Sequence, residues 1–163
     1  QGASYACVLD GHGGSRAADF GAAELHRRMA ADEGLRLDAD KVGDKVAASF
    51  KRVFSTTDRD FLAAARSEQW GDGTTVCAAL LHGNTLHIAN VGDTRAVLAT
   101  TGEAAAAGAT GVATSVSTNW GGGGGGGAAA ELAVRLSVDH KPNLPEEAAR
   151  VRAMGGDVRC VQG

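Results

Sequence analysis

The sequence predicts an α+β fold in which two long helices cover one face of an antiparallel sheet and further strands cover the other face. Three observations favour this fold. Apolar residues recur at three- and four-residue spacing along two consecutive segments, which is typical of amphipathic helices. Three short apolar segments follow, separated by tight polar turns. One of these segments is apolar on both alternating sides, as expected of a strand that is buried on both faces.

The first part of the chain is expected to form one strand and two helices. Residues 5–9 are apolar and strand-like, and a glycine-rich turn follows them. A stripe of apolar residues at helical spacing then predicts a helix over residues 15–31. A second helix is expected over residues 40–66, because its apolar residues share one face and its basic residues lie elsewhere.

The middle of the chain is expected to form three strands of an antiparallel meander. These are TTVCAALL at residues 74–81, LHIANV at 86–91 and TRAVLAT at 94–100. Because both faces of the first strand are apolar, this strand should pack between the helices and a second sheet.

The composition changes between residues 102 and 130, where Ala, Gly, Ser and Thr dominate and seven glycines follow one another. Such a segment buries too little apolar area to offset its ordering entropy, so a disordered, low-complexity insert is expected there. Strand character returns in LAVRLSVDH at residues 132–140, as if the insert occupied the tip of a hairpin. A short helix is expected over residues 145–154, with a strand at 157–160.

Composition also limits the partners that we expect. The 163 residues carry a net charge of −3 and no basic stripe, which argues against nucleic acid as a partner. No apolar stretch approaches the ~20 residues of a membrane helix, and no signal peptide is recognisable. We therefore expect an intracellular monomer, cytoplasmic or nuclear, that does not bind membranes. The cysteines should be reduced and buried, and four histidines should lie at the surface or in turns: Cys7, Cys77 and Cys160; His26, His82, His87 and His140.

Two aspartates stand at the ends of apolar segments. Asp10 lies in VLDGHGG, where glycines allow backbone oxygens and the carboxylate to face one point, an arrangement suited to a hard cation. Alternatively, Asp10 caps the helix that follows. Asp93 lies in NVGDTRAVL, where an ordinary Gly-Asp hairpin turn is the alternative.

Four blocks in order resemble the metal-dependent protein phosphatases of type 2C: VLDGHGG, GDGTTVCAALL, NVGDTRAVL, and LSVDHKP followed by PEEAARVRAMGGDV. The resemblance runs from about residue 5 to residue 163, interrupted by the insert. It implies a four-layer α-β-β-α sandwich, with two antiparallel sheets flanked by helix pairs. This chain would carry one helix pair and part of both sheets, as a partial catalytic domain that is incomplete at both ends.

The resemblance also implies an activity and a site. Type 2C phosphatases hydrolyse phosphoserine and phosphothreonine in proteins with water activated at a binuclear Mg²⁺ or Mn²⁺ centre. Asp10 matches the aspartate that bridges the two ions, and the Gly11 carbonyl matches a ligand of one of them. His12 matches the histidine proposed to protonate the leaving oxygen, a task suited to an imidazole. Asp93 matches a ligand of a third, weaker metal site.

Several positions of the family pattern have no match in this sequence. The phosphate-binding arginine and an acidic metal ligand would precede VLDGHGG, and two further metal aspartates would follow residue 163. The Asp-Gly steps present, at Asp10 and Asp72, lie in other blocks. We therefore expect residues 1–163 alone to be inactive, because Asp10 and Gly11 leave most positions of an octahedral site to water.

Two rival functions remain. A pseudophosphatase or interaction module would keep the fold and lose the chemistry, although retention of the four matched residues argues against this. An α/β-hydrolase is suggested by HGG at residues 12–14, but the nearest G-x-S-x-G candidate, GGSRA, overlaps that same segment. No P-loop is present, and the glycine run satisfies G-x-G-x-x-G trivially.

Overall fold

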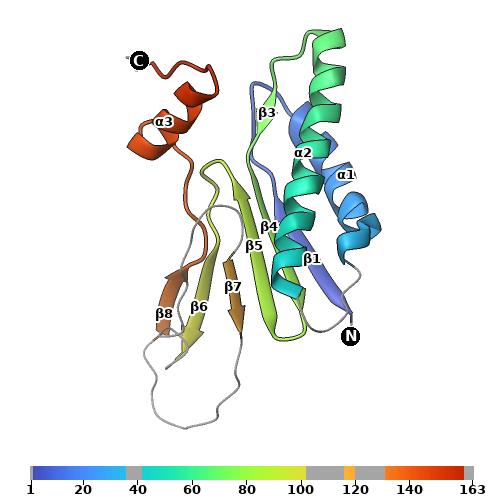
Figure 1. The fold of residues 1–163 in the computed structure, drawn as a ribbon, viewed down its shortest axis with the longest axis vertical. Helices are drawn as coiled ribbons and strands as arrows, with labels where there is room; N and C mark the ends of the chain where they lie inside the picture. Colours follow the sequence, from blue (N-terminus) through green and yellow to red (C-terminus); the bar gives the residue numbers. More distant parts are fainter. Residues whose placement is uncertain (1, 36–41, 102–115, 120–130, 160–163) are drawn as a thin grey trace.

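The computed structural model describes residues 2–35, 42–101, 116–119 and 131–159. Figure 1 shows two helices on one side of the main sheet, a smaller strand pair on the other side, and α3 near the carboxyl end of the chain. No helix within these described ranges is both long enough and apolar enough to cross a membrane. The α+β class predicted from the sequence is confirmed, because the described part of the chain contains three α-helices and antiparallel sheets.

The main sheet has four antiparallel strands in the order β1-β4-β5-β7. Its centre is the predicted hairpin, in which His82 of β4 pairs with Thr85 of β5. Strand β1 pairs with β4 so that Val8 lies opposite Cys77. This register brings the end of β1 beside the start of β4. The strands are β1 Ala3–Val8, β4 Val76–His82, β5 Thr85–Val91 and β7 Val116–Asn119.

The predicted three-stranded meander is wrong at its third strand. β6 (Val97–Thr101) leaves the main sheet and pairs with β8 (Glu131–Arg135) in a separate sheet. The physical reason is burial, because Leu98 of β6 and Leu136 after β8 pack with Ile88 on the second face of β5. The antiparallel pairing of β6 with β8 agrees with the expected hairpin around the insert.

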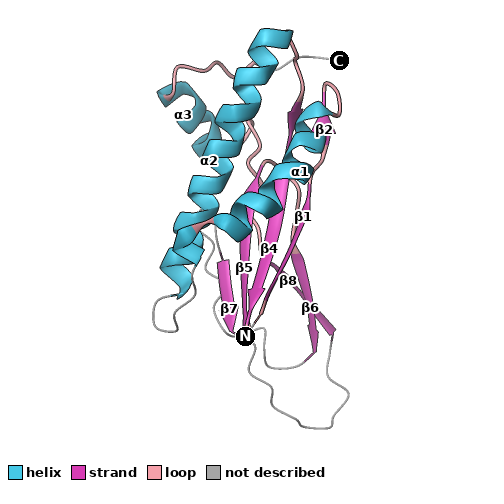
Figure 2. Cartoon of the chain, turned by 90° about the vertical axis from the view of Figure 1, so that its right-hand side faces the viewer, coloured by secondary structure: helices cyan, strands magenta, loops and turns pink. Residues whose placement is uncertain are grey.

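Helices α1 (Arg16–Ala31) and α2 (Val42–Glu68) cover the opposite face of the main sheet, as Figure 2 shows. The sequence placed both within two residues of the described bounds, although residues 40 and 41 lie outside the described part. A short 3-10 helix, η1 (Glu33–Leu35), follows α1. The core between helices and sheet contains the following buried residues: Leu25, Met29, Val46, Phe50, Val53, Ala78, Leu80 and Ala89.

Strand β4 is covered on both faces, as its sequence predicts. Ala78 and Leu80 belong to the helix-facing core, whereas Cys77 packs with Leu136 on the side of the second sheet. The described residues thus form helix, sheet and sheet layers. The fourth layer implied by the family resemblance is not seen in them, since α3 (Pro145–Ala153) is the single helix beyond β8 in the described part.

Three further expectations differ from the structure. Residues 116–119 lie inside the expected disordered insert, yet they form β7, which pairs with the open edge of β5 and satisfies backbone groups there. The rest of that segment, 102–115 and 120–130, lies outside the described residues. A strand was expected at residues 157–160, but residues 157–159 form no strand, and residue 160 lies outside the described residues. His87 was expected at the surface or in a turn, yet it lies in β5 and is 1% exposed. Its pKa is lowered, mainly by burial and also by the nearby charge of His82.

Candidate functional site

Asp10 lies just beyond β1, where its backbone is fixed to the start of β4. Its N–H donates to Thr75 Oγ1 at 3.3 Å, and its carbonyl accepts from the Thr75 N–H at 3.0 Å. The side chain is exposed, and within the described residues no hydrogen bond or ion pair reaches its carboxylate. Asp10 therefore has a fixed backbone and an uncompensated carboxylate that is accessible to a ligand.

The alternative in which Asp10 caps the following helix is wrong. Ser15 occupies the N-cap position of α1 and makes no side-chain cap hydrogen bond. The first N–H of the helix, on Arg16, instead donates to Asp72 Oδ2 at 3.0 Å. This cap comes from a residue 56 positions later, so local sequence patterns could not reveal it.

Gly11 and His12 form the two-residue strand β2, which pairs with β3 (Gly73–Thr74). His12 is exposed, and its ring lies so close to Gly73 that a Cβ at that position would collide with Nε2. A glycine is thus required at residue 73 for the imidazole to keep this place. His12 also lines a cavity of about 670 Å³.

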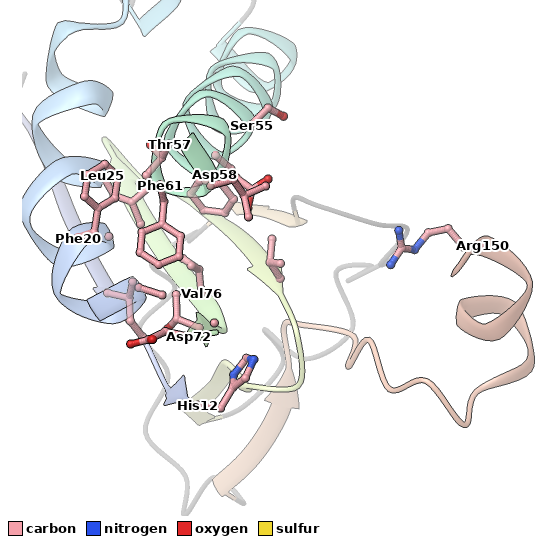
Figure 3. A pocket seen from close by; sticks show the side chains of 18 residues that line it. His12, Phe20, Leu25, Ser55, Thr57, Asp58, Phe61, Asp72, Val76 and Arg150 are labelled. Atoms are coloured by element: carbon pink, nitrogen blue, oxygen red, sulfur yellow. The ribbon is translucent and has the colours of Figure 1, made fainter. Parts of the chain in front are cut away.

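Figure 3 shows the cavity that His12 borders, between the helix layer and the end of the main sheet. Its walls are largely apolar, with Phe20 and Phe61 among the aromatic side chains that face it. Asp58 and Arg150 add charge at its edge. An imidazole at such a border can meet both solvent and a ligand.

Asp93 lies in the loop that carries the chain from β5 to the second sheet, so the alternative of a simple hairpin turn is wrong. Its Oδ2 atom is 3.5 Å from Lys141 Nζ. The neighbouring Thr94 Oγ1 lies 2.6 Å from Thr75 Oγ1, the same hydroxyl that accepts from the Asp10 N–H. Thr75 therefore joins the two loops that carry the predicted metal aspartates.

A charged cluster beside these loops was missed from the sequence. The Asp139 carboxylate accepts hydrogen bonds from Arg95 and Arg135, and its side chain is 7% exposed. The hydrogen bonds from Arg95 are the main cause of a lowered pKa for Asp139. The separation of four residues between Arg135 and Asp139 was a weak signal, whereas Arg95 is distant in sequence.

His140 and Lys141, which had no role from the sequence, hold the same loop. The His140 N–H donates to the Gly92 carbonyl at 2.9 Å, and Lys141 contacts Asp93. Asn90 Nδ2 completes the junction by donating to the carbonyls of Gly92 and Val138. The LSVDHKP segment therefore positions the Asp93 loop.

The donor set fits a hard cation only in part. Asp10 and Asp93 offer accessible carboxylate oxygens, the ligand type preferred by Mg²⁺ and Mn²⁺. However, the described residues contain no group of three or more His, Cys, Asp or Glu side chains that could hold a metal ion. Cys7 and Cys77 are free thiols, as predicted; Cys77 is buried as expected, whereas Cys7 is only partly buried. Cys160 lies outside the described residues.

Comparisons with known proteins identify the family of this chain. The chain matches the Protein phosphatase 2C family over residues 1–162. It is 35% identical over 162 residues to the integrin-linked kinase-associated serine/threonine phosphatase 2C of Bos taurus, covering 96% of this chain and 36% of that protein. It is 34% identical to the probable protein phosphatase 2C 55 of Oryza sativa subsp. japonica, covering 93% of this chain and 31% of the relative.

Solved structures show the same fold at lower sequence identity. The serine-threonine phosphatase 2C from Toxoplasma gondii matches with a TM-score of 0.69 and 14% identity, over 94% of this chain and 45% of that chain. A sex determining protein of C. elegans matches with a TM-score of 0.66 and 19% identity, over 99% of this chain and 32% of that one.

The fold defines a domain of mixed helices and antiparallel sheets, as in these solved structures. The chain belongs to the Protein phosphatase 2C family. It spans about a third of the length of the curated relatives it matches.

Proposed function

We propose that the full-length protein hydrolyses phosphoserine and phosphothreonine in protein substrates, with water activated at a binuclear Mg²⁺ or Mn²⁺ centre. One observation carries the proposal. Asp10 presents a carboxylate with no partner among the described residues, and His12, two positions later, presents an exposed imidazole at the border of a cavity. An exposed carboxylate two positions from an exposed imidazole suits hydrolysis, in which a charged phosphoryl group must be neutralised and a leaving oxygen protonated.

Asp10 and the Gly11 carbonyl would hold the binuclear centre, and Asp93 would contribute to a third ion. When bound, such ions lower the pKa of water and neutralise charge on phosphoryl oxygens. Thr75 supports this assignment, because its hydroxyl fixes the Asp10 backbone and bonds to Thr94 in the Asp93 loop. The remaining ligands would come from outside the described residues or from water, since no group of three lies within them.

His12 would donate the proton that the departing serine or threonine oxygen needs. Alkoxide leaving groups are poor, so a positioned acid contributes roughly 10² to 10⁴-fold to such a step. The close contact of the ring with Gly73 supports this role, because it limits the places that the imidazole can occupy. The Asp10 carboxylate lies two residues away and would serve as a ligand of the cations.

A pseudophosphatase is the second candidate function. The lack of a three-residue metal group in the described part favours it, since one bridging aspartate and one carbonyl hold a cation weakly. We expect the isolated 163-residue chain to be inactive for the same reason. With either function, the complete domain would be the four-layer sandwich of the family, and this chain would form part of it.

The test is phosphate release from a phosphothreonine peptide by the full-length protein, with a phosphotyrosine peptide of the same sequence as control. We expect release from the phosphothreonine peptide in Mn²⁺ or Mg²⁺ and much slower release from the phosphotyrosine peptide. Absence of release from both peptides at millimolar metal would favour the pseudophosphatase.

A further inference from the structure

The start of helix α1 is held by a residue from a distant part of the chain. Asp72 accepts a hydrogen bond from the Arg16 N–H through Oδ2 and from Arg16 Nη1 through Oδ1, at 3.0 and 2.9 Å. The Asp72 side chain is 1% exposed. The local candidate, Ser15, directs its hydroxyl to Asp19 Oδ2 instead. With its side chain buried, Asp72 thus accepts from the first N–H of the helix and also forms an ion pair.

The same carboxylate supports the turn that follows His12. Gly14 has φ +151° and approaches Asp72 so closely that a Cβ would collide with Oδ2. Gly73, the neighbour of Asp72, is in contact with the His12 ring. The turn from β2 to α1 is therefore in contact with the 72–73 segment at its His12 end and at its helix end.

Aromatic packing anchors this segment to the helix layer. The Arg16 guanidinium lies 5.2 Å from the centre of the Trp70 ring, and Trp70 packs against Phe61 of α2 at 6.2 Å between ring centres. Cation–π and aromatic contacts of this kind add to the ion pair and limit its movement. The chain from Trp70 to Asp72 therefore contacts Arg16 twice, through the Trp70 ring and through the Asp72 carboxylate.

We infer that Asp72 is a positioning residue for His12: its carboxylate fixes the turn and helix start that set the place of the imidazole. This inference rests on the proposed role of His12 in phosphate hydrolysis. Asp72 acts through the turn, because its two oxygens are already bonded to Arg16. Figure 3 shows His12 and Asp72 from adjacent segments at one end of the cavity.

Helix α1 offers a matched control at its other end. Asp32 accepts hydrogen bonds from Gly34 N–H, Ser49 Oγ and Arg52, and its side chain is 12% exposed. Both aspartates thus bond an arginine and a backbone N–H. The ends of this 16-residue helix are separated by about 24 Å, so loss of Asp32 should not reach His12.

The experiment measures kcat of the full-length protein for aryl phosphates whose leaving phenols differ in pKa. A displaced acid slows poor leaving groups most. We expect Asp72→Ala to lower kcat about 10-fold for phenyl phosphate and less than 2-fold for dinitrophenyl phosphate, with Asp72→Asn intermediate. Asp32→Ala should leave the dependence on leaving group unchanged at a similar loss of Tm.

The double variant His12→Ala with Asp72→Ala decides whether Asp72 acts through His12. Residues that act through one group have non-additive effects. We expect no further leaving-group dependence beyond that of His12→Ala alone. An equal loss across all phenols, a full additive loss in the double variant, or the same change in Asp32→Ala would each overturn the inference.

A second readout separates this inference from the proposed function. If the wild type lacks activity, the proposed function fails, and the NMR signal of the His12 ring still reports its position. We expect that signal to shift in Asp72→Asn and to stay unchanged in Asp32→Ala. Asp72→Asn keeps one acceptor for the Arg16 N–H, so it remains usable if Asp72→Ala does not fold. An unchanged His12 signal in Asp72→Asn would overturn the inference.

Discussion

Asp10 and Asp139 both lie in loops that contact the segment 94–95, Asp10 through Thr75 and Asp139 through Arg95, yet the surroundings of their carboxylates differ. Asp139 is buried and bonded to Arg95 and Arg135, so its charge is compensated within the protein. Asp10 is exposed, and its carboxylate has no partner among the described residues. The difference separates a structural carboxylate, whose loss should affect stability, from one available to a ligand, whose loss should affect function.

The largest effect is expected from Asp10→Asn in the full-length protein. Loss of a bridging carboxylate should lower kcat/KM for a phosphothreonine peptide by roughly 10³-fold, because several kcal/mol of charge stabilisation depend on the cations that it holds. Tm in the absence of metal should change little, because the side chain bonds to nothing in the described part. Asp44→Asn, at an exposed site in the first turn of α2, is the matched control and should keep its activity.

His12→Ala should lower kcat for phosphopeptides by roughly 10²-fold and should lower it less for nitrophenyl phosphate, whose leaving group needs little protonation. The assay compares both substrates at saturating Mn²⁺. His26→Ala serves as control, because that exposed ring contacts the Ala22 carbonyl on α1 and lies outside the cavity lining. Equal losses on both substrates would contradict the role of His12 as an acid.

Thr75→Val should lower kcat roughly 10-fold, because it removes the hydroxyl that bonds to the Asp10 N–H and to Thr94 while keeping the side-chain shape. The loops that carry Asp10 and Asp93 should then be held less firmly. Thr56→Val is the control, since its hydroxyl bonds only within α2, to the Val53 carbonyl. Similar activity in the two variants would show that Thr75 does not join the two loops functionally.

Asp139→Asn should lower Tm by roughly 5 °C at pH 7 and change kcat least of the four variants. The Arg95 hydrogen bonds lower the pKa of Asp139, so the stabilisation is present above the unfolded pKa of about 4 and is lost as pH falls through the lower folded pKa. The difference in Tm between wild type and variant should therefore shrink below about pH 4. The measurement is thermal unfolding of both proteins between pH 3 and 7, monitored by circular dichroism. A difference in Tm that stayed constant over this range would contradict the prediction.

The parts of the fold set by local periodicity could be predicted from the sequence. The stripes on α1 and α2 and the β4–β5 hairpin follow from the spacing of neighbouring apolar residues. The departure of β6 to a second sheet could not be predicted in this way, because Leu98 is buried by contacts with residues distant in sequence. In the same way, β7 forms because the edge of β5 is open to pairing, and the composition of residues 116–119 does not reveal this.

The same distinction between local and distant contacts decides which site residues could be predicted. Asp10, Gly11, His12 and Asp93 were identified because their blocks resemble a known family. Asp72, Thr75 and Asp139 were missed as supporting residues, since each acts on a partner more than 15 positions away: Asp72 on Arg16, Thr75 on Thr94 and Asp139 on Arg95. Periodicity and short motifs carry no information about such pairs.

The central claim is that the Asp10 carboxylate binds the catalytic cations, and Mn²⁺ titration of the full-length protein by calorimetry tests it most directly. We predict saturable binding to the wild type and to Asp44→Asn, with affinity reduced at least 10-fold in Asp10→Asn. Equal Mn²⁺ affinity in Asp10→Asn and the wild type would contradict the account.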